Sequence, residues 1–254
     1  MKKVLLVAVC MLASQNANAA VTSSTVHGSA GNSLDASISV GDALSGLIGT
    51  ELPGDQGWHP ANTNPAQQLP IFTDDRGGSG LDGLLNDFPP AGAPTKIVQY
   101  DLANPTDLAA IKILTGNDGK DGRVFSTTLI DVSTNNGGSF TQLGYFESDL
   151  PGTVNAGQWG STLVTITDDG GAPLATGVTN LKFSFFAVDN TGGEYRDPFD
   201  GVNPYTGIDD TYNAPIASPL VWEIDAVAVP EPATVALAAI ALGGMLALRR
   251  RRIE

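Results

Sequence analysis

The chain of 254 residues has a single cysteine, Cys10, only two histidines, and 13 basic against 27 acidic side chains. Cys10 falls in an N-terminal apolar run that we expect to be removed, so the mature chain has neither a disulfide nor a thiol nucleophile. No G-x-S-x-G or H-E-x-x-H motif occurs, and His27 and His59 both lie in irregular sequence. We therefore expect no enzyme activity. A glycoside-active enzyme is the least favoured alternative, since no pair of carboxylates is singled out.

Basic residues are scarcest between residues 20 and 229, where seven lysines and arginines face 25 aspartates and glutamates, a formal charge of −18. Such a surface repels nucleic acid and anionic membranes, so we expect no nucleic-acid partner. It suits cations or neutral sugars. A solvated acidic surface of an exported protein explains the same charge.

The N-terminus has the pattern of a secretory signal peptide. Lys2 and Lys3 precede an apolar run over residues 4–13, and small residues, Ala17 and Ala19, stand at the −3 and −1 positions of a cleavage site after residue 19. We expect residues 1–19 to be removed during export through the inner membrane.

The C-terminal residues 230–254 combine a Pro-Glu-Pro triplet, sixteen uncharged residues over 233–248, and four arginines over 249–252. Sixteen residues of helix span about 24 Å, which is short of the ~30 Å hydrocarbon core of a bilayer. We predict a single, weakly held transmembrane helix with its positive end in the cytoplasm. The residues that define the pattern are Pro230, Glu231, Pro232, Arg249, Arg250, Arg251 and Arg252.

This order of parts resembles the PEP-CTERM sorting signal of Gram-negative bacteria that make exopolysaccharide. The resemblance implies that the tail is held transiently in the inner membrane and that exosortase, a membrane protease, cuts near residues 230–232. It also implies release of the body to the cell surface or extracellular matrix, with exopolysaccharide as a partner. An ordinary C-terminal anchor, or a buried helix with a basic end, is the alternative.

The body reads as an all-β domain, because short alternating or β-branched runs recur between Gly, Asn, Asp and Pro clusters. We expect an irregular Gly/Ser/Pro-rich region over residues 20–73 and an antiparallel β-sandwich over 74–229. Leu181, Phe183 and Phe185 alternate along one face and predict a buried face. The expected strands are 96–102, 110–114, 124–132, 140–146, 162–167, 181–188 and 221–229.

Several of these runs resemble successive strands and turns of a discoidin, or galactose-binding-like, jelly roll. The clearest are Gly137-Gly138-Ser139-Phe140 in a hairpin and Glu223-Ile224-Asp225 in the closing strand. The resemblance covers about residues 74–229 and implies a jelly-roll fold. The front third departs from the family pattern, and about 30 residues over 189–219 are inserted before the last strand, so ligand-contact residues do not carry over.

The run Ile71-Phe72-Thr73-Asp74-Asp75 resembles the loop that, in many discoidin-like domains, shares a structural calcium ion with a glutamate in the last strand. Glu223 matches that glutamate. Calcium binds six to eight oxygen ligands, which carboxylates supply. Asp74, Asp75 and Glu223 are therefore candidate Ca²⁺ ligands. The alternative is a solvated turn, with Glu223 paired to a lysine.

Aromatic residues in polar loops are the candidate ligand contacts, because their rings can stack on sugar faces. These residues are Trp58, Tyr195, Tyr205 and Tyr212. Two functions follow. The first is a non-catalytic surface or matrix protein that associates with exopolysaccharide. The alternative is a carbohydrate-binding module that recognises a defined glycan.

Overall fold

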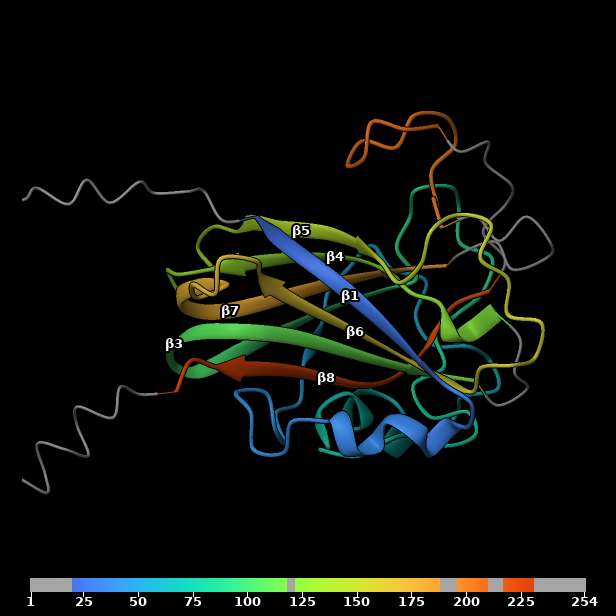
Figure 1. Cartoon of the computed structure of the whole chain (residues 1–254), viewed down its shortest axis with the longest axis horizontal. Coiled ribbons are helices and arrows are strands. Elements are labelled where there is room, and N and C mark those ends of the chain that lie inside the picture. The colour runs from blue at the N-terminus through green and yellow to red at the C-terminus, as the bar shows by residue number, and fades with distance from the viewer. Residues whose placement is uncertain (1–19, 118–121, 188–195, 210–216, 231–254) are drawn as a thin grey trace, which may run out of the picture.

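The computed structural model describes residues 20–117, 122–187, 196–209 and 217–230. It confirms the prediction of a predominantly β protein with an antiparallel sheet (Figure 1). The strands are β1 (Val21–Gly28), β2 (Thr50–Glu51), β3 (Lys96–Gly116), β4 (Thr127–Ser133), β5 (Thr141–Glu147), β6 (Ser161–Asp168), β7 (Ala175–Phe186) and β8 (Leu220–Ala228). The described helices are short 3₁₀ turns: η1 (Gly31–Ser37), η2 (Pro65–Gln67), η3 (Leu69–Thr73) and η4 (Gly122–Val124).

Strand β3 is the centre of the topology, because it pairs with four other strands. Its first part pairs with β2 and β7, and its second part pairs with β8 and β6. Register shifts between Asp101 and Ala110 mark where the strand bends from one set of partners to the other. The sheet therefore has two parts that share β3, one ordered β2-β3-β7-β4-β5 and the other β8-β3-β6-β1.

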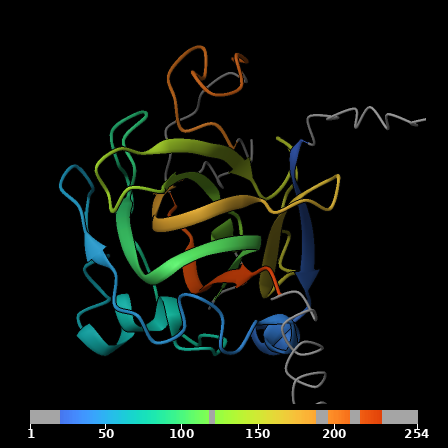
Figure 2. The same cartoon turned by 90° about the vertical axis from the view of Figure 1, so that its left-hand side faces the viewer.

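The sheet curls around its core, as the end-on view shows (Figure 2). The strands at the two ends of the main path, β1 and β5, approach each other where β5 ends. The Thr25 hydroxyl donates to the Ser148 carbonyl, and His27 Nε2 lies 2.8 Å from Asp149 Oδ1. These side-chain contacts close the gap that backbone pairing leaves open.

One apolar core fills the space that the sheet encloses. Phe183 and Phe185 of β7 are fully buried there, as their alternation predicted, and they pack with Ile224 of β8. Leu44 and Phe72, from the region where we expected irregular structure, are fully buried in the same core. That region also supplies β1, which pairs with β6 along its whole length.

A smaller apolar cluster lies on the other side of β8, around Trp222. A Cβ at Gly116 would lie 2.0 Å from the Trp222 ring, and one at Gly78 would lie 2.1 Å from it. Only glycine therefore fits at these two positions. The loop that contains Gly78 is thus held against β8, which determines where the preceding residues 72–76 lie.

Strand β8 ends at Ala228, and the exposed Pro230 follows two residues later. The rest of the predicted sorting tail, residues 231–254, and the predicted signal peptide lie outside the described residues. The helix expected over 233–248 is thus not described. In the part of the chain that the structure covers, no helix is long and apolar enough to cross a membrane.

Candidate functional site

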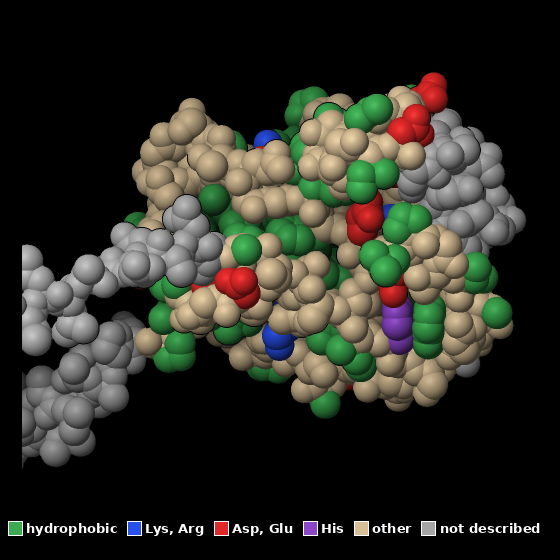
Figure 3. Space-filling view, turned by 45° about the horizontal axis from the view of Figure 1, so that its top comes forward, with side chains coloured by type: hydrophobic (Ala, Val, Ile, Leu, Met, Phe, Trp, Pro, Cys, Tyr) green, Lys and Arg blue, Asp and Glu red, His purple; other side chains and the backbone are tan. Residues whose placement is uncertain are grey.

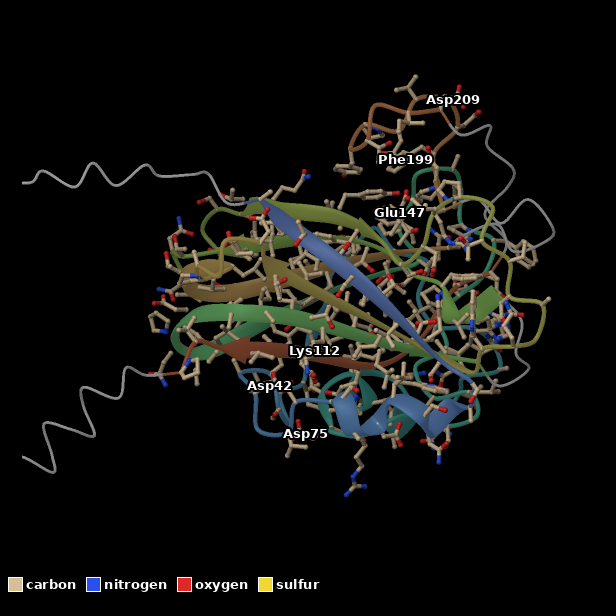
Figure 4. All side chains as sticks on the ribbon, in the orientation of Figure 1. Asp42, Asp75, Lys112, Glu147, Phe199 and Asp209 are labelled. Atoms are coloured by element: carbon tan, nitrogen blue, oxygen red, sulfur yellow. The ribbon has the colours of Figure 1, made fainter. Side chains whose placement is uncertain are left out.

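Five carboxylates gather along β8 on the side covered by residues 31–48 and 72–76. We call them the acidic cluster: Asp42, Asp74, Asp75, Glu223 and Asp225. Figure 4 shows Asp42 and Asp75 on this side, below β8, with Lys112 of β3 beside them. Residues 42 and 43 run along the free edge of β8, where the Ala43 N–H donates to the Ala226 carbonyl at 2.9 Å.

The structure brings Asp74 next to Glu223. The backbone N–H of Arg76 lies 3.1 Å from Asp74 Oδ1 and 3.3 Å from Glu223 Oε2, so it donates to both carboxylates. The turn that follows η3 directs the Arg76 N–H toward both carboxylates, because Asp75, the residue before Arg76, adopts a left-handed conformation with φ of 61°. Two of the three predicted calcium ligands are therefore neighbours.

The third predicted ligand, Asp75, points elsewhere. Its Oδ1 accepts a hydrogen bond from the Ser45 hydroxyl at 2.6 Å, and its Oδ2 accepts one from the Gly41 N–H at 3.3 Å. Ser45 also donates to Asp42 Oδ2 at 3.0 Å. Asp75 is thus linked to Asp42 rather than to Glu223.

Asp42 and Asp225 are members of the cluster that sequence reasoning did not find. Asp42 Oδ1 accepts hydrogen bonds from the backbone N–H groups of Leu44 and Ala226, each at 2.8 Å. Asp225 Oδ2 accepts one from the Ser39 N–H at 2.7 Å, and Lys112 Nζ lies 4.0 Å from the same oxygen. Lys112, the lysine beside the cluster, therefore pairs with Asp225 and not with Glu223.

Burial raises the pKa of four carboxyl groups of the cluster, those of Asp42, Asp74, Glu223 and Asp225. Glu223 and Asp225 are each 1% exposed. Burial, reinforced by the charge of Asp225, raises the pKa of Glu223 to about 9. Burial also raises the pKa of Asp225 to about 6, although the Ser39 N–H opposes the shift. Burial raises the pKa of Asp42 and of Asp74 as well. The cluster needs either protons or a cation to balance its charge.

Two oxygens of the cluster, Glu223 Oε1 and Asp225 Oδ1, are buried and have no hydrogen-bond partner among the described residues. Buried carboxylate oxygens without donors fit a hard cation such as Ca²⁺. In the described part of the chain, however, no three Asp, Glu, His or Cys side chains converge into a metal-binding group. A bound ion would therefore need backbone carbonyls or water to complete its ligands.

The aromatic candidates differ in accessibility. Trp58 is half-buried: its Nε1 donates to Glu51 at 2.6 Å, and the Lys96 Nζ lies 4.6 Å from its ring centre. Its ring is thus occupied by the protein itself. Tyr205 lies in the loop 197–209 and is 37% exposed. Tyr195 and Tyr212 lie outside the described residues.

Tyr205 is part of an ordered aromatic group that we call the Tyr205 platform: Tyr145, Phe199 and Tyr205. The rings of Tyr205 and Tyr145 stack with centres 4.9 Å apart and planes 12° apart, and Phe199 meets Tyr205 edge-on at 5.7 Å. Figure 4 shows Phe199 and Glu147 on the opposite side of the molecule from Asp42 and Asp75. The platform and the acidic cluster are therefore separate sites.

A small cavity of about 160 Å³ lies beside the platform, lined by Glu147, Leu150, Pro151, Asp197, Thr206 and Ile208. Leu150 and Ile208 are strongly exposed at its rim. The Asp197 Oδ1 accepts a hydrogen bond from Asn203 Nδ2 at 3.0 Å, which holds the loop 197–209 in shape. The cavity thus combines an apolar rim with carboxylate oxygens.

Figure 3 shows one face of the molecule, on which hydrophobic side chains are interspersed with separate acidic ones.

One constellation has the connectivity of a hydrolytic triad. His27 Nδ1 lies 2.9 Å from the Thr162 hydroxyl, and its Nε2 lies 2.8 Å from Asp149 Oδ1. Thr162 is 0% exposed, however, and Trp159 stacks on the imidazole with ring centres 3.8 Å apart. A substrate cannot reach the hydroxyl, so these contacts hold β1 against the loop after β5.

Comparison with known families gives one match. Residues 228–252 match the PEP-CTERM protein-sorting motif. No curated protein matches the chain. The motif indicates export via the membrane and implies exosortase as the processing partner. It covers the tail and leaves the function of the body open.

Proposed function

We propose that the protein is a non-catalytic component of the cell surface or extracellular matrix that associates with exopolysaccharide after exosortase has released it from the inner membrane of a Gram-negative bacterium. The sorting motif over residues 228–252 supports export and processing. The Tyr205 platform supports the association with polysaccharide, and it is the observation on which the proposal depends.

The platform suits a sugar ring because its aromatic surface is held in place before any ligand binds. Tyr145 supports one face of Tyr205, and Phe199 packs against its edge. Little side-chain entropy is then lost when a sugar stacks on the exposed part of the ring. Repeated weak contacts of this kind are sufficient for retention on a polymer, since a polysaccharide offers many equivalent sites.

The charge around the platform restricts the polysaccharide. Glu147 and Asp197 line the adjacent cavity, and carboxylates accept hydrogen bonds from sugar hydroxyl groups. The formal charge of −18 over residues 20–229 repels anionic polymers. We therefore expect a neutral or amino-containing polysaccharide.

Retention on purified exopolysaccharide tests the proposal. The wild type should be retained, Tyr205→Ala should be retained less, and Tyr205→Phe should behave as the wild type because it keeps the ring. Val40→Ala is the control, since Val40 is 77% exposed and lies beside Asp42, on the side of the molecule opposite the platform. If the wild type is not retained, the proposal is wrong.

The alternative is a carbohydrate-binding module that recognises one defined glycan, and the same platform favours it. A glycan array separates the two functions. Binding to a single glycan, lost in Tyr205→Ala, supports the module. Broad, salt-sensitive binding to crude matrix supports the matrix protein.

We also propose a structural Ca²⁺ ion held by Asp74 and Glu223, with backbone carbonyls or water as its other ligands. The unpartnered oxygen Glu223 Oε1 supports it. The ion would hold the loop 72–76 against β8 and would balance carboxylates that otherwise take up protons. Its role is stability, not catalysis.

For the fold, we propose that the two parts of the sheet are the layers of a galactose-binding-like jelly roll. Support comes from the antiparallel pairing of all strands and from the single core that residues of both parts share. An experimental structure in which β6 and β8 do not face β4 and β7 across this core would contradict the proposal.

A further inference from the structure

Lys96, the first residue of β3, is a lysine with no exposed surface. Its Nζ lies 3.2 Å from Glu51 Oε1 and 3.4 Å from Asp55 Oδ2. Neither contact has the alignment of a hydrogen bond, so Nζ has no hydrogen-bond partner among the described residues. The Trp58 ring covers it at 4.6 Å. A buried amine thus faces two carboxylates.

We propose that Lys96 and Asp55 form an intramolecular isopeptide bond, and that Glu51 transfers the proton. The ammonium of Lys96 gives one proton to Glu51, and the neutral amine attacks the carboxyl carbon of Asp55. The N–C bond forms and one C–O bond breaks. Glu51 returns its proton to the departing oxygen, which also takes the second proton that the amine loses, and water leaves. The ammonium and the carboxylate become an amide and one water, with no redox change.

Asp55 is the acceptor because its carboxyl group is fixed and polarised on both oxygens. The N–H of Gly57 donates to Oδ1 at 3.1 Å, and the N–H of Ile97 donates to Oδ2 at 3.0 Å. Backbone donors placed in this way stabilise the negative charge that develops on a carboxyl oxygen during attack. The side chain is also mostly buried.

Glu51 suits proton transfer for a different reason. Trp58 Nε1 donates to its Oε1 at 2.6 Å and so holds the oxygen beside Lys96. The Glu51 side chain is nevertheless 43% exposed, so it connects the buried amine with solvent. This exposure provides a path by which the released water leaves.

Burial favours the amide over the ion pair. Removing a lysine and a carboxylate from water is costly, whereas a neutral amide in the same place avoids most of that penalty. Groups already held in contact also react as if at very high concentration, on the order of 10⁵ M or more. The bond would tie the loop 51–58 to β3 in a chain that has no cysteine after residue 19.

Lys182 provides an internal comparison. Its Nζ lies only 2.9 Å from Asp131 Oδ2, and the Phe140 ring covers it at 4.8 Å. Its side chain is partly exposed, however, and no second carboxylate pairs with it among the described residues. We expect this pair to remain an ordinary ion pair.

Intact-mass measurement of the folded, purified chain over residues 20–229 tests the proposal. We expect a mass lower than that of the sequence by one water, and a branched proteolytic peptide that joins Lys96 to Asp55. Succinimide formation at Asp-Gly sequences loses the same mass, so the branched peptide is the decisive evidence. A full sequence mass after prolonged incubation of the folded protein would overturn the proposal.

Variants separate the chemistry from structural effects. Lys96→Arg keeps the charge and should show the full mass. Asp55→Asn keeps an acceptor and should lose one ammonia instead of one water. Glu51→Gln keeps the Lys96 and Asp55 pair and should form the bond more slowly, and Lys182→Arg should change nothing. Loss of one water in Lys96→Arg would show that the mass change arises elsewhere and would overturn the proposal.

Discussion

Proton uptake by Glu223 predicts an unusual pH dependence of stability in calcium-free buffer. The pKa of Glu223 is about 9 in the folded protein against 4.5 in the unfolded chain, chiefly because of burial. Between these values the folded state holds a proton that the unfolded state has released. The free energy of unfolding must then fall as the pH rises, by about 1.4 kcal/mol per pH unit.

The expected loss between about pH 5 and pH 8 is about 4 kcal/mol from Glu223, which is a large part of the stability of a typical domain. Asp225 makes the dependence steeper below about pH 6, where its raised pKa lies. Urea unfolding at several pH values, with chelator present, measures this slope directly.

Calcium binding should compete with protonation of the Glu223 carboxylate. An ion that binds only the folded state stabilises it by about 2.7 kcal/mol at a hundredfold excess over its dissociation constant. Its effect should grow with pH, because the proton and the ion compete for the same carboxylate. Magnesium at equal ionic strength should help much less, since it needs a tighter octahedron and retains its water.

Two variants complete the test. Glu223→Gln should flatten the pH dependence by about 1.4 kcal/mol per pH unit and remove the calcium response. Asp75→Asn makes the same chemical change in the same loop, but on the Ser45 side, and should change neither. The reasoning is refuted if Glu223→Gln keeps the full slope. Equal stabilisation by magnesium and calcium, unchanged in that variant, would remove the proposed ion.

The remaining predictions concern the tail, the core and the curl of the sheet. Secreted protein should end near Val229 by intact mass, and recovery of chain that still carries Arg252 from the medium would contradict processing by exosortase. Phe183→Asp should prevent folding, and Phe183→Ala should cost about 3–5 kcal/mol in urea unfolding, because the ring is fully buried; a loss below 1 kcal/mol would show that the site is not a packed core. His27→Ala should increase hydrogen exchange in β1 more than in β7, and unchanged exchange would show that its contacts with Asp149 and Thr162 do not hold the strand.

The sequence was informative where apolar residues alternate. Leu181, Phe183 and Phe185 predicted a buried face, and all three are fully buried in β7. Strand β1 lacks such alternation, and its order comes from pairing with β6. Strands were expected separately over 96–102 and 110–114, with Asn104-Pro105 between them. The structure continues through it as β3, because register shifts absorb a proline that cannot donate a hydrogen bond.

The acidic cluster was predictable only in part. A loop resemblance suggested Asp74 and Glu223, and the structure places them together. Asp42 and Asp225 could not be found, since nothing in the sequence separates a buried carboxylate from the many solvated ones. The hydrogen bond from the Ala226 N–H to Asp42, which brings these two residues to the same site, joins positions 184 apart in the sequence and forms only when β8 packs against the loop around Asp42.

Both ends of the folded body leave from the same pole. The Asp169 N–H donates to the Ala20 carbonyl at 3.1 Å, the Val229 N–H donates to the Asp107 carbonyl at 2.8 Å, and in Figure 1 β1 begins and β8 ends on the left-hand side of the molecule. Both ends of the chain can therefore be held at one bilayer while the β domain folds on the exported side of that membrane. Cleavage before Ala20 or after Val229 cuts no described strand, so the two proteolytic events can occur in either order without undoing the fold.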